Sequence, residues 1–167
     1  MPGTKKKPVV AEAQTYFTYE TSYGAITIAS DGNAIVALVF RESAVSGGIK
    51  EASSLTDLAV KQIEEYFTGK RRQFDLPVSP SGTCFQEAVW KELLAIPYGE
   101  TRSYKQIAQA IGKPKACRAV GMANNRNPIS IIIPCHRVIG ANGSLVGYGG
   151  GLEMKQKLLD LEMREAL

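Results

Sequence analysis

The residues of this sequence best suited to chemistry are a cysteine and a histidine that stand side by side, Cys135 and His136. The chain has three cysteines, the other two being Cys84 and Cys117, and His136 is its one histidine. A thiolate is a strong nucleophile that nearby histidine and arginine side chains stabilise, so His136 and Arg137 predict a reactive thiol at Cys135. The alternative is a structural cysteine, the usual role of a free thiol and the one that we expect for Cys84 and Cys117.

The segment before Cys135 is apolar and predicts how the cysteine is held. Ile129–Ile133 is interrupted only by Ser130 and is followed by Pro134, which indicates a buried extended segment that ends at the proline. A nucleophile in such a place would be rigidly positioned. Neighbouring side chains of a strand point to opposite faces, so His136 can serve Cys135 as a base only if the chain turns or a water molecule relays the proton.

A cysteine–histidine pair usually needs a third group that orients the imidazole. Glu162 is the candidate, because it lies on a predicted last helix, Leu152–Glu162, four residues after Leu158 and three after Leu159. This spacing places the carboxylate on the apolar face of the helix, where it would be partly buried and would need a partner. The alternative is an exposed glutamate in the last helical turn.

A metal site is not expected from these residues. The adjacent pair Cys135-His136 lacks the spacing typical of zinc ligands, and the chain has no CxxC motif. Asp31, Asp57 and Asp75 are scattered along the sequence and form no carboxylate cluster. The sequence therefore predicts chemistry without a metal ion.

The composition is that of a globular protein. The chain has 167 residues, 44% of them hydrophobic and 22% charged, which excludes a disordered or collagen-like chain. No apolar run approaches the roughly 18 residues of a membrane span, and three cysteines cannot all pair with one another. We therefore expect a protein without membrane association in a reducing compartment, the cytoplasm or, in a eukaryote, the nucleus. Met1–Val10 contains three lysines but no apolar stretch follows them, so we expect a mobile tail and no secretory signal.

Positive charge is concentrated in one segment of the chain. The formal net charge is +4, and Thr101–Leu152 contains seven lysine and arginine residues and no acidic residue. A surface of this kind attracts a polyanion such as nucleic acid. The alternative is a solvated basic face that binds no partner.

Two short helices are predicted within this basic segment. Ser103 suits the N-cap of the first, whose apolar stripe begins at Tyr104 and which Gly112 ends, and Pro114 suits the first turn of the second. The second helix carries Ala116, Val120 and Ala123 on one face and Lys115, Arg118, Met122 and Asn125 on the opposite face. Two short helices joined by a glycine-containing turn, with small residues inside and polar residues outside, are typical of a DNA-binding helix-turn-helix.

The first half of the chain predicts a small α/β unit. The expected strands are Tyr16–Tyr19, Ala25–Ala29 and Ala34–Phe40, and the expected helix is Leu55–Phe67. No nucleophile with a partnered base stands in this half, so we interpret it as scaffold. Pro77–Gly82 is the predicted linker, and a further helix begins near Phe85 and ends at Pro97. We thus expect an α/β N-terminal domain, residues 1–79 with the basic tail, and a mostly α-helical C-terminal domain, residues 80–167, with a helix-turn-helix.

Several motifs follow one another in the second half. They are Phe85-Gln86, Val89-Trp90, Ile96-Pro97-Tyr98-Gly99-Glu100-Thr101, Ser103-Tyr104, Arg118-Ala119-Val120-Gly121, Asn127-Pro128, Ile133-Pro134-Cys135-His136-Arg137-Val138 and Gly147-Tyr148. From Phe85 to Glu162, about half of the chain, the sequence closely resembles the O6-alkylguanine-DNA alkyltransferases. The series around Pro-Cys-His-Arg-Val is highly specific, whereas the first half is only compatible with the variable ribonuclease-H-like domain of that family.

The resemblance implies a repair protein that flips O6-alkylguanine out of double-stranded DNA and takes the alkyl group onto its own cysteine, with O4-alkylthymine as a further candidate substrate. Matched to the motifs, Cys135 would be the acceptor, His136 the base acting through a water molecule, and Glu162 the group that orients it. Extrusion of the base is necessary because the O6 atom lies inside the base stack. The thioether product has no leaving route, so we expect one turnover per molecule, without a cofactor or an obligatory protein partner.

The resemblance also implies roles outside the cysteine segment. Arg118 would fill the space left by the flipped nucleotide, and Asn127 would connect the recognition helix to the cysteine segment. Tyr104 would donate a hydrogen bond to the guanine, on which negative charge develops as the thiolate attacks. The remaining assignments are Ser103, Lys115, Met122, Asn125 and Arg126 to DNA binding, and Val138, Tyr148, Gly149 and Lys155 to the substrate pocket.

The chain departs from the family pattern at few positions. Some relatives carry serine in place of Gly149, and a backbone N–H contact would survive that change. No cysteine precedes Cys84, so the N-terminal zinc site of some relatives is absent. Relatives that have lost activity carry another residue in place of Cys135, so the intact cysteine favours chemistry.

Two other functions fit parts of the sequence. In a non-catalytic DNA-binding module, Cys135 would be merely buried, and Cys135→Ala would leave every effect of the protein intact. A cysteine hydrolase would use Cys135 and His136 to turn over a small ester repeatedly. The basic, acid-free segment disfavours the hydrolase, because it would have no role there.

Overall fold

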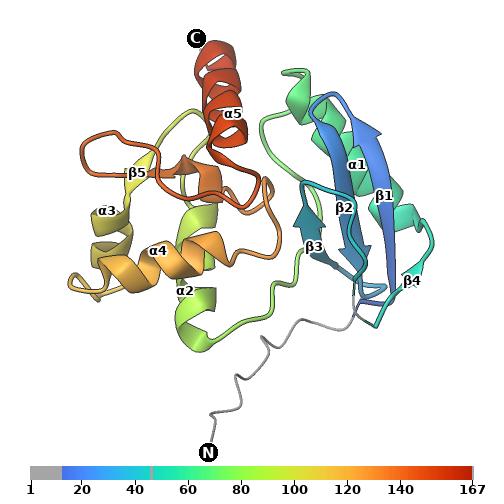
Figure 1. Ribbon diagram of the computed structural model, residues 1–167, viewed down its shortest axis with the longest axis horizontal. Coiled ribbons are helices and arrows are strands. Elements are labelled where there is room, and N and C mark those ends of the chain that lie inside the picture. The colour runs from blue at the N-terminus through green and yellow to red at the C-terminus, as the bar shows by residue number, and fades with distance from the viewer. Residues whose placement is uncertain (1–12, 46, 167) are drawn as a thin grey trace, which may run out of the picture.

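The computed structural model describes residues 13–45 and 47–166. The predicted tail Met1–Val10 lies outside the described residues. Figure 1 shows two lobes side by side, a sheet with one helix and a group of helices. The prediction of an α/β domain followed by a mostly helical domain is confirmed.

The N-terminal lobe is a sheet of order β3-β2-β1-β4 covered by α1. Its elements are β1 (Thr15–Thr21), β2 (Gly24–Ser30), β3 (Ile35–Val39), β4 (Ile49–Lys50) and α1 (Ser54–Phe67). β1, β2 and β3 are antiparallel, as expected for strands joined by short turns, and β4, which the sequence did not predict, runs parallel to β1. Ser53 caps α1 and closes a capping box with Thr56. Ile26, Ile28 and Leu38 of the sheet and Ile63 of α1 are fully buried, so they fix the helix on the sheet.

The C-terminal lobe contains the predicted helix-turn-helix. Its elements are α2 (Cys84–Leu94), β5 (Arg102–Ser103), α3 (Tyr104–Ala110), α4 (Cys117–Asn125), the 3-10 helix η1 (Cys135–Arg137), β6 (Val138–Ile139) and α5 (Leu152–Glu165). α4 packs on α2 and α3, and its buried residues are Val120, Ala123 and Asn124. Val120 and Ala123 were predicted, whereas Ala116, the third residue of the predicted stripe, is the N-cap and is only partly buried. The helix begins at Cys117 rather than at Pro114, because residues 113–116 form a turn closed by the bond from the Ala116 N–H to the Lys113 carbonyl. Lys115 therefore lies in this turn and not on the helix.

The two lobes share one hydrophobic core and are joined by backbone hydrogen bonds on β3. Leu38 of β3 donates to the carbonyl of Pro128 (2.9 Å) and accepts from the N–H of Ser130 (3.2 Å). The beginning of the predicted linker also pairs with β3, since Ile35 donates to Pro77 (2.8 Å) and accepts from Ser79 (2.9 Å). The start of the linker is thus part of the sheet edge. The division at residues 79 and 80 stays a prediction.

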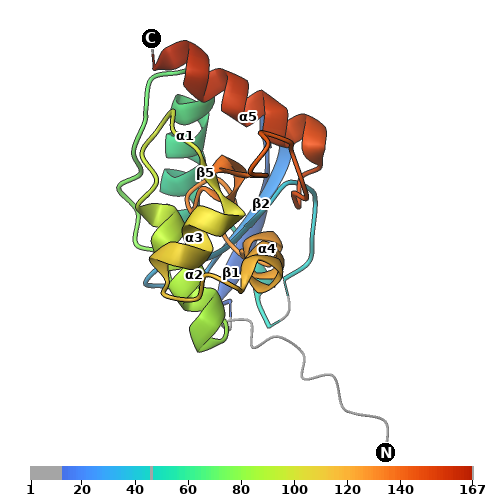
Figure 2. The ribbon, with the colours of Figure 1, turned by 90° about the vertical axis from the view of Figure 1, so that its left-hand side faces the viewer.

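The last helix, α5, also contacts both lobes. Figures 1 and 2 show it at the top of the molecule, ending near the C-terminus. The Lys157 ammonium group lies 4.1 Å from the centroid of the Tyr23 ring, and Arg72 donates to the carbonyl of Glu165. These contacts hold α5, the helix that carries Glu162, against the N-terminal lobe.

Candidate active site

The segment that carries Cys135 is buried but is not an extended strand, so that prediction is wrong. Only Ile129 forms a bridge to β3, and Ile131 has a positive φ of 72°, a backbone conformation that costs energy for a β-branched residue. Two tight turns follow, closed by bonds from Ile132 to Ser130 (2.9 Å) and from Cys135 to Ile133 (2.8 Å). The chain turns again in η1, so Cys135 and His136 do not have to point in opposite directions as they would in a strand.

His136 is paired with the predicted partner, Glu162. The imidazole Nε2 lies 2.6 Å from Glu162 Oε2, and both side chains are almost completely buried. The alternative of an exposed Glu162 is therefore wrong. Burial alone would raise the pKa of Glu162, but hydrogen bonds and positive charge from His136 and Arg137 outweigh it and hold the pKa well below its usual range. Glu162 is thus a carboxylate at neutral pH.

The carboxylate fixes which imidazole nitrogen can accept a proton. Because Glu162 is ionised, we assign the proton of neutral His136 to Nε2, which donates to Glu162. Nδ1 is then the acceptor atom, and it is buried without a hydrogen-bond partner among the described residues. Burial lowers the pKa of His136, although its contact with Glu162 opposes the shift. His136 is therefore neutral near pH 7, as a general base must be.

Arg137 does not act as the sequence suggested. Its guanidinium group bonds Glu162 through Nε (2.8 Å) and Nη2 (3.1 Å), and Nη1 donates to the carbonyl of Ile96 (2.7 Å). All three nitrogen atoms are thus engaged away from Cys135. Arg137 stabilises the Glu162 carboxylate, and through it the orientation of His136, rather than the thiolate itself.

The pKa of the Cys135 thiol is set by two opposing effects, burial and nearby polar or charged groups. Burial raises its pKa, while the Asn127 amide, the positive charge of Lys155 and backbone N–H groups lower it. The Lys155 side chain is fully buried, and its ammonium group donates to the carbonyls of Val146 (3.1 Å) and Gly147 (3.4 Å). The thiol is therefore neutral at rest and needs a base to become a nucleophile.

Two asparagines at the C-terminal end of α4, Asn124 in its last turn and Asn127 just after it, join this helix to the cysteine segment. Asn127 donates to the carbonyl of Ile133 (2.8 Å) and accepts from the N–H of Ile129 (3.0 Å), which places it where the sequence expected it. Asn124, which the sequence reasoning missed, donates to the carbonyl of Cys135 (3.3 Å). A displacement of α4 would therefore also move the backbone at Cys135.

A cavity of about 220 Å³ opens beside Cys135. It is lined by Val39, Phe40, Arg41, Asn124, Asn125, Asn127, Ser130, Cys135 and Gly149. Three of these residues belong to the end of β3 and the segment after it, so the N-terminal lobe forms one wall. Of the residues assigned to the pocket, Gly149 lines this cavity, whereas Val138 is buried in β6, paired with Arg102.

The tyrosines assigned to the site lie close to it. The hydroxyl group of Tyr104 donates to the carbonyl of Val146 (2.8 Å), and the Lys155 ammonium group is 5.9 Å from the centroid of the Tyr104 ring. The hydroxyl of Tyr148 is buried and has no hydrogen-bond partner among the described residues. Burial, followed by the charge of Cys135, raises the pKa of both tyrosines, so both remain hydrogen-bond donors at neutral pH.

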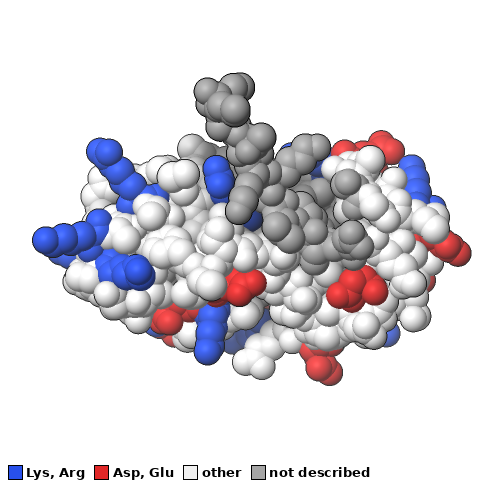
Figure 3. All heavy atoms as spheres, turned by 90° about the horizontal axis from the view of Figure 1, so that it is seen from below, with Lys and Arg blue, Asp and Glu red and all other residues white. Residues whose placement is uncertain are grey.

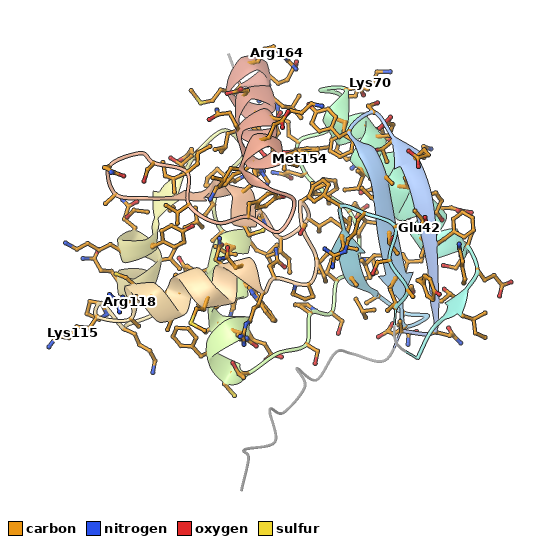
Figure 4. The ribbon with its side chains drawn as sticks, in the orientation of Figure 1. Glu42, Lys70, Lys115, Arg118, Met154 and Arg164 are labelled. Atoms are coloured by element: carbon orange, nitrogen blue, oxygen red, sulfur yellow. The ribbon has the colours of Figure 1, made fainter. Side chains whose placement is uncertain are left out.

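The basic face predicted for the helix-turn-helix is exposed. Lys115, Arg118, Met122, Asn125 and Arg126 are all exposed, and Ser103 is partly buried because its hydroxyl caps α3. Figure 4 shows Lys115 and Arg118 pointing outward at the end of the molecule farthest from the sheet. Figure 3 shows lysine and arginine side chains gathered at this end, whereas acidic and basic side chains are mixed over the rest of this face. The face is thus free to meet a polyanion.

Comparisons with known proteins agree with this site. Residues 15–80 match the family described as 6-O-methylguanine DNA methyltransferase, ribonuclease-like domain, and residues 84–164 match the DNA binding domain of the same name. A methylated-DNA–protein-cysteine methyltransferase from Methanosarcina acetivorans is 48% identical over 151 residues, which cover 88% of this chain and 97% of that protein. The chain belongs to the methylated-DNA–protein-cysteine methyltransferase family.

Other relatives support the same placement of this methyltransferase. The Methanosarcina barkeri protein of that name is 64% identical over 104 residues, which cover 62% of this chain and 66% of that protein. The crystal structure of Mycobacterium tuberculosis OGT in complex with DNA has 47% sequence identity and a TM-score of 0.85, covering 90% of this chain and 94% of that one. The fold and the activity of the family, transfer of a methyl group from DNA to a cysteine of the protein, are therefore those of this chain. In the described ranges, no helix is long and apolar enough to cross a membrane.

Proposed function

We propose that Cys135 is the alkyl acceptor of this methyltransferase and that O6-alkylguanine in double-stranded DNA is its substrate. The observation that carries the assignment is the arrangement of Cys135, His136 and Glu162. A buried thiol opens onto a cavity, and the adjacent imidazole is held at Nε2 by a carboxylate, which leaves Nδ1 as a buried acceptor. Cys84 is exposed, and neither Cys84 nor Cys117 stands beside a histidine.

The reaction needs one proton transfer and one displacement. His136 Nδ1 takes the thiol proton, directly or through a water molecule, and the resulting imidazolium is stabilised by Glu162. The thiolate of Cys135 then attacks the alkyl carbon, so that a sulfur–carbon bond forms as the bond between that carbon and O6 breaks. The guanine leaves with the electron pair of the broken bond and takes up a proton. Tyr104 stabilises the charge that develops on the guanine by donating to it, after giving up its present bond to Val146.

The helix-turn-helix supplies access to the damaged base. We assign Arg118 on the exposed face of α4 to the gap in the base stack, and Lys115, Met122, Asn125 and Arg126 to the surrounding DNA. Extruding a base costs a few kcal/mol, which an arginine that stacks and donates hydrogen bonds in the gap offsets. Asn124 and Asn127 connect this helix to the segment of Cys135 by hydrogen bonds. The same helix therefore helps to position both the flipped base and the thiol. The DNA bound by the M. tuberculosis relative supports DNA as the partner.

The proposal predicts stoichiometric self-alkylation. A thioether has no leaving route under these conditions, so each molecule reacts once. The test is intact-protein and peptide mass spectrometry after mixing with an excess of duplex that contains O6-methylguanine. We expect one added methyl group, located on Cys135, and none in Cys135→Ala, whereas Cys117→Ala reacts as the wild type does. Binding of the duplex without modification of Cys135 would refute the assignment and favour a damage-binding module.

A further inference from the structure

The carboxylate that orients His136 is also held by the N-terminal lobe. Tyr66 of α1 is fully buried, and its hydroxyl group lies 2.5 Å from Glu162 Oε2 and 3.4 Å from His136 Nε2. Tyr66 is 96 residues away from Glu162 in the sequence, and no motif pointed to it. The N-terminal half, which the sequence suggested to be scaffold only, thus reaches the His136–Glu162 pair.

Glu162 is surrounded by hydrogen-bond donors from separate parts of the fold. It accepts five hydrogen bonds, from His136, from Tyr66, from Arg137 through two nitrogen atoms, and from the N–H of Gly99. Oε2, the atom bonded to His136, also accepts hydrogen bonds from the Tyr66 hydroxyl group and from Arg137 Nη2, so three donors share one oxygen. A hydroxyl group at this place limits how the carboxylate can rotate and how much negative charge it presents to the imidazole.

We infer that Tyr66 is a positioning residue for the methyl transfer, so that the ribonuclease-like lobe is part of the catalytic apparatus. Its hydroxyl group holds Glu162 in the orientation that keeps the His136 proton on Nε2 and leaves Nδ1 free for the thiol. The inference rests on the proposed assignment of Cys135 as acceptor and His136 as base.

Tyr66 remains a donor throughout the working range. Burial, followed by the charge of Glu162, raises its pKa well above the ordinary value, so the hydroxyl stays protonated. The titratable and charged groups that face the His136–Glu162 pair are Tyr66 from α1, Tyr98 from the loop after α2, Cys135 and Arg137 from η1, Tyr148 from the loop before α5, and Lys155 from α5. Of these, Tyr66 is the one that lies in the N-terminal lobe.

Removal of the hydroxyl group has a predictable sign. In Tyr66→Phe the carboxylate keeps its other donors but presents more uncompensated charge to the imidazole, which stabilises the imidazolium form. The pKa of His136 then rises, and the base is available only at higher pH. The acid limb of the alkylation rate should move up by about one pH unit, so the rate should fall roughly tenfold on that limb and by no more than about threefold at pH 7.

A neighbouring tyrosine provides a matched control. The Tyr98 hydroxyl group is buried and has no hydrogen-bond partner among the described residues, and the Tyr98 and Tyr66 rings pack edge to face at 6.1 Å between centroids. Tyr98→Phe therefore removes a buried hydroxyl from the same region without removing a bond to Glu162. We expect its alkylation rate and its pH profile to match those of the wild type.

The single histidine of the chain permits a direct measurement. In protein without a histidine tag, the imidazole ¹⁵N NMR signals belong to His136 alone, so they report its tautomer and its titration. We expect an Nε2-protonated imidazole in the wild type and in Tyr98→Phe, and a higher pKa of His136 in Tyr66→Phe. A purely structural role for Tyr66 would lower the melting temperature and leave this titration unchanged.

A second variant keeps the test decisive if Tyr66→Phe does not fold. Site-specific replacement of Tyr66 by 3-fluorotyrosine retains the ring and the hydroxyl but makes the phenol a stronger donor, so the pKa of His136 should fall instead of rise. The inference is refuted if a folded Tyr66→Phe, or the fluorinated protein in its place, matches the wild type both in alkylation rate and in the His136 titration. If wild-type Cys135 takes up no alkyl group, the proposed function itself fails, which is a distinguishable result.

Discussion

The variant Glu162→Gln tests the central part of the site, because it removes a charge while preserving the shape of the side chain. In the wild type, Glu162 is almost completely buried and pairs with the buried guanidinium group of Arg137 and with His136. Glutamine keeps one acceptor oxygen but replaces the other with an amide nitrogen, which cannot accept the bonds that now converge there. The buried charge of Arg137 is then left without its partner.

The magnitude follows from that uncompensated charge. Removing one partner of a buried ion pair costs about 3–5 kcal/mol, a large part of the roughly 5–15 kcal/mol that stabilises a typical domain. The same substitution removes the group that orients His136 and stabilises its protonated form, and general-base catalysis of this kind contributes about 10²–10⁴-fold. We therefore expect Glu162→Gln to lose both stability and rate.

A double-mutant cycle with Arg137→Gln separates the two losses. Urea unfolding measures the free energy of unfolding, and single-turnover alkylation with an O6-methylguanine duplex measures the rate, under conditions in which every variant is folded. In the double variant the unpaired charge is gone, so we expect it to be more stable than the sum of the single effects by about 1–3 kcal/mol. Its rate should stay as low as that of Glu162→Gln, because His136 still lacks its carboxylate.

The reasoning fails on either of two results. A loss in stability below about 1 kcal/mol for Glu162→Gln would mean that the pair with Arg137 is not a buried ion pair of the usual strength. A double variant that recovers the wild-type rate would mean that Glu162 serves the fold and not the base.

The remaining predictions concern pH, DNA and the thiol. The pKa of His136 is lowered below 6.5 in the folded state, so the unfolded chain binds more protons and stability should fall as the pH drops below about 6.5; urea unfolding should show this limb in the wild type and not in His136→Asn. Arg118→Ala should react roughly tenfold to a hundredfold more slowly with alkylated duplex but normally with free O6-alkylguanine base, because the stacking that it loses acts only on DNA. Arg164→Ala, exposed at the far end of α5 in Figure 4, is its control and should match the wild type on both substrates. Lys155→Met should raise the pKa of Cys135 further, since a neighbouring positive charge that lowers it is removed; labelling of Cys135 by iodoacetamide should then shift to higher pH, with exposed Lys157→Met unchanged.

Local features of the chain were readable without the structure because they depend on short-range spacing. The small residues Val120 and Ala123 alternate with exposed Arg118 and Met122 at helical intervals, so the buried and free faces of α4 follow from the sequence. The position of Glu162 on the apolar face of the last helix was found in the same way. Its burial made a partner necessary, and the structure supplies that partner as His136.

The path of the cysteine segment was misjudged for a physical reason. An apolar run predicts burial, but burial alone does not distinguish a strand from a compact series of turns. In the structure, residues 128–130 pair with β3, and the chain then turns at Ile131 despite its unfavourable positive φ. Glycine and asparagine, the usual signals for such a turn, are missing from residues 129–134, and Ile131 adopts the strained conformation while it is almost completely buried.

The sequence by itself determined the chemistry-bearing neighbours Cys135 and His136, the outward face of the recognition helix and the third group, Glu162. Only the tertiary structure decided what surrounds that carboxylate, since Arg137 turns towards it and Tyr66 arrives from the other lobe. It also decided that the end of β3 walls the cavity beside the thiol. Spacing along a helix or strand determines which side chains share a face. Contacts between residues that are distant in the sequence depend on how the two lobes pack, and the pattern of a single segment does not contain that information.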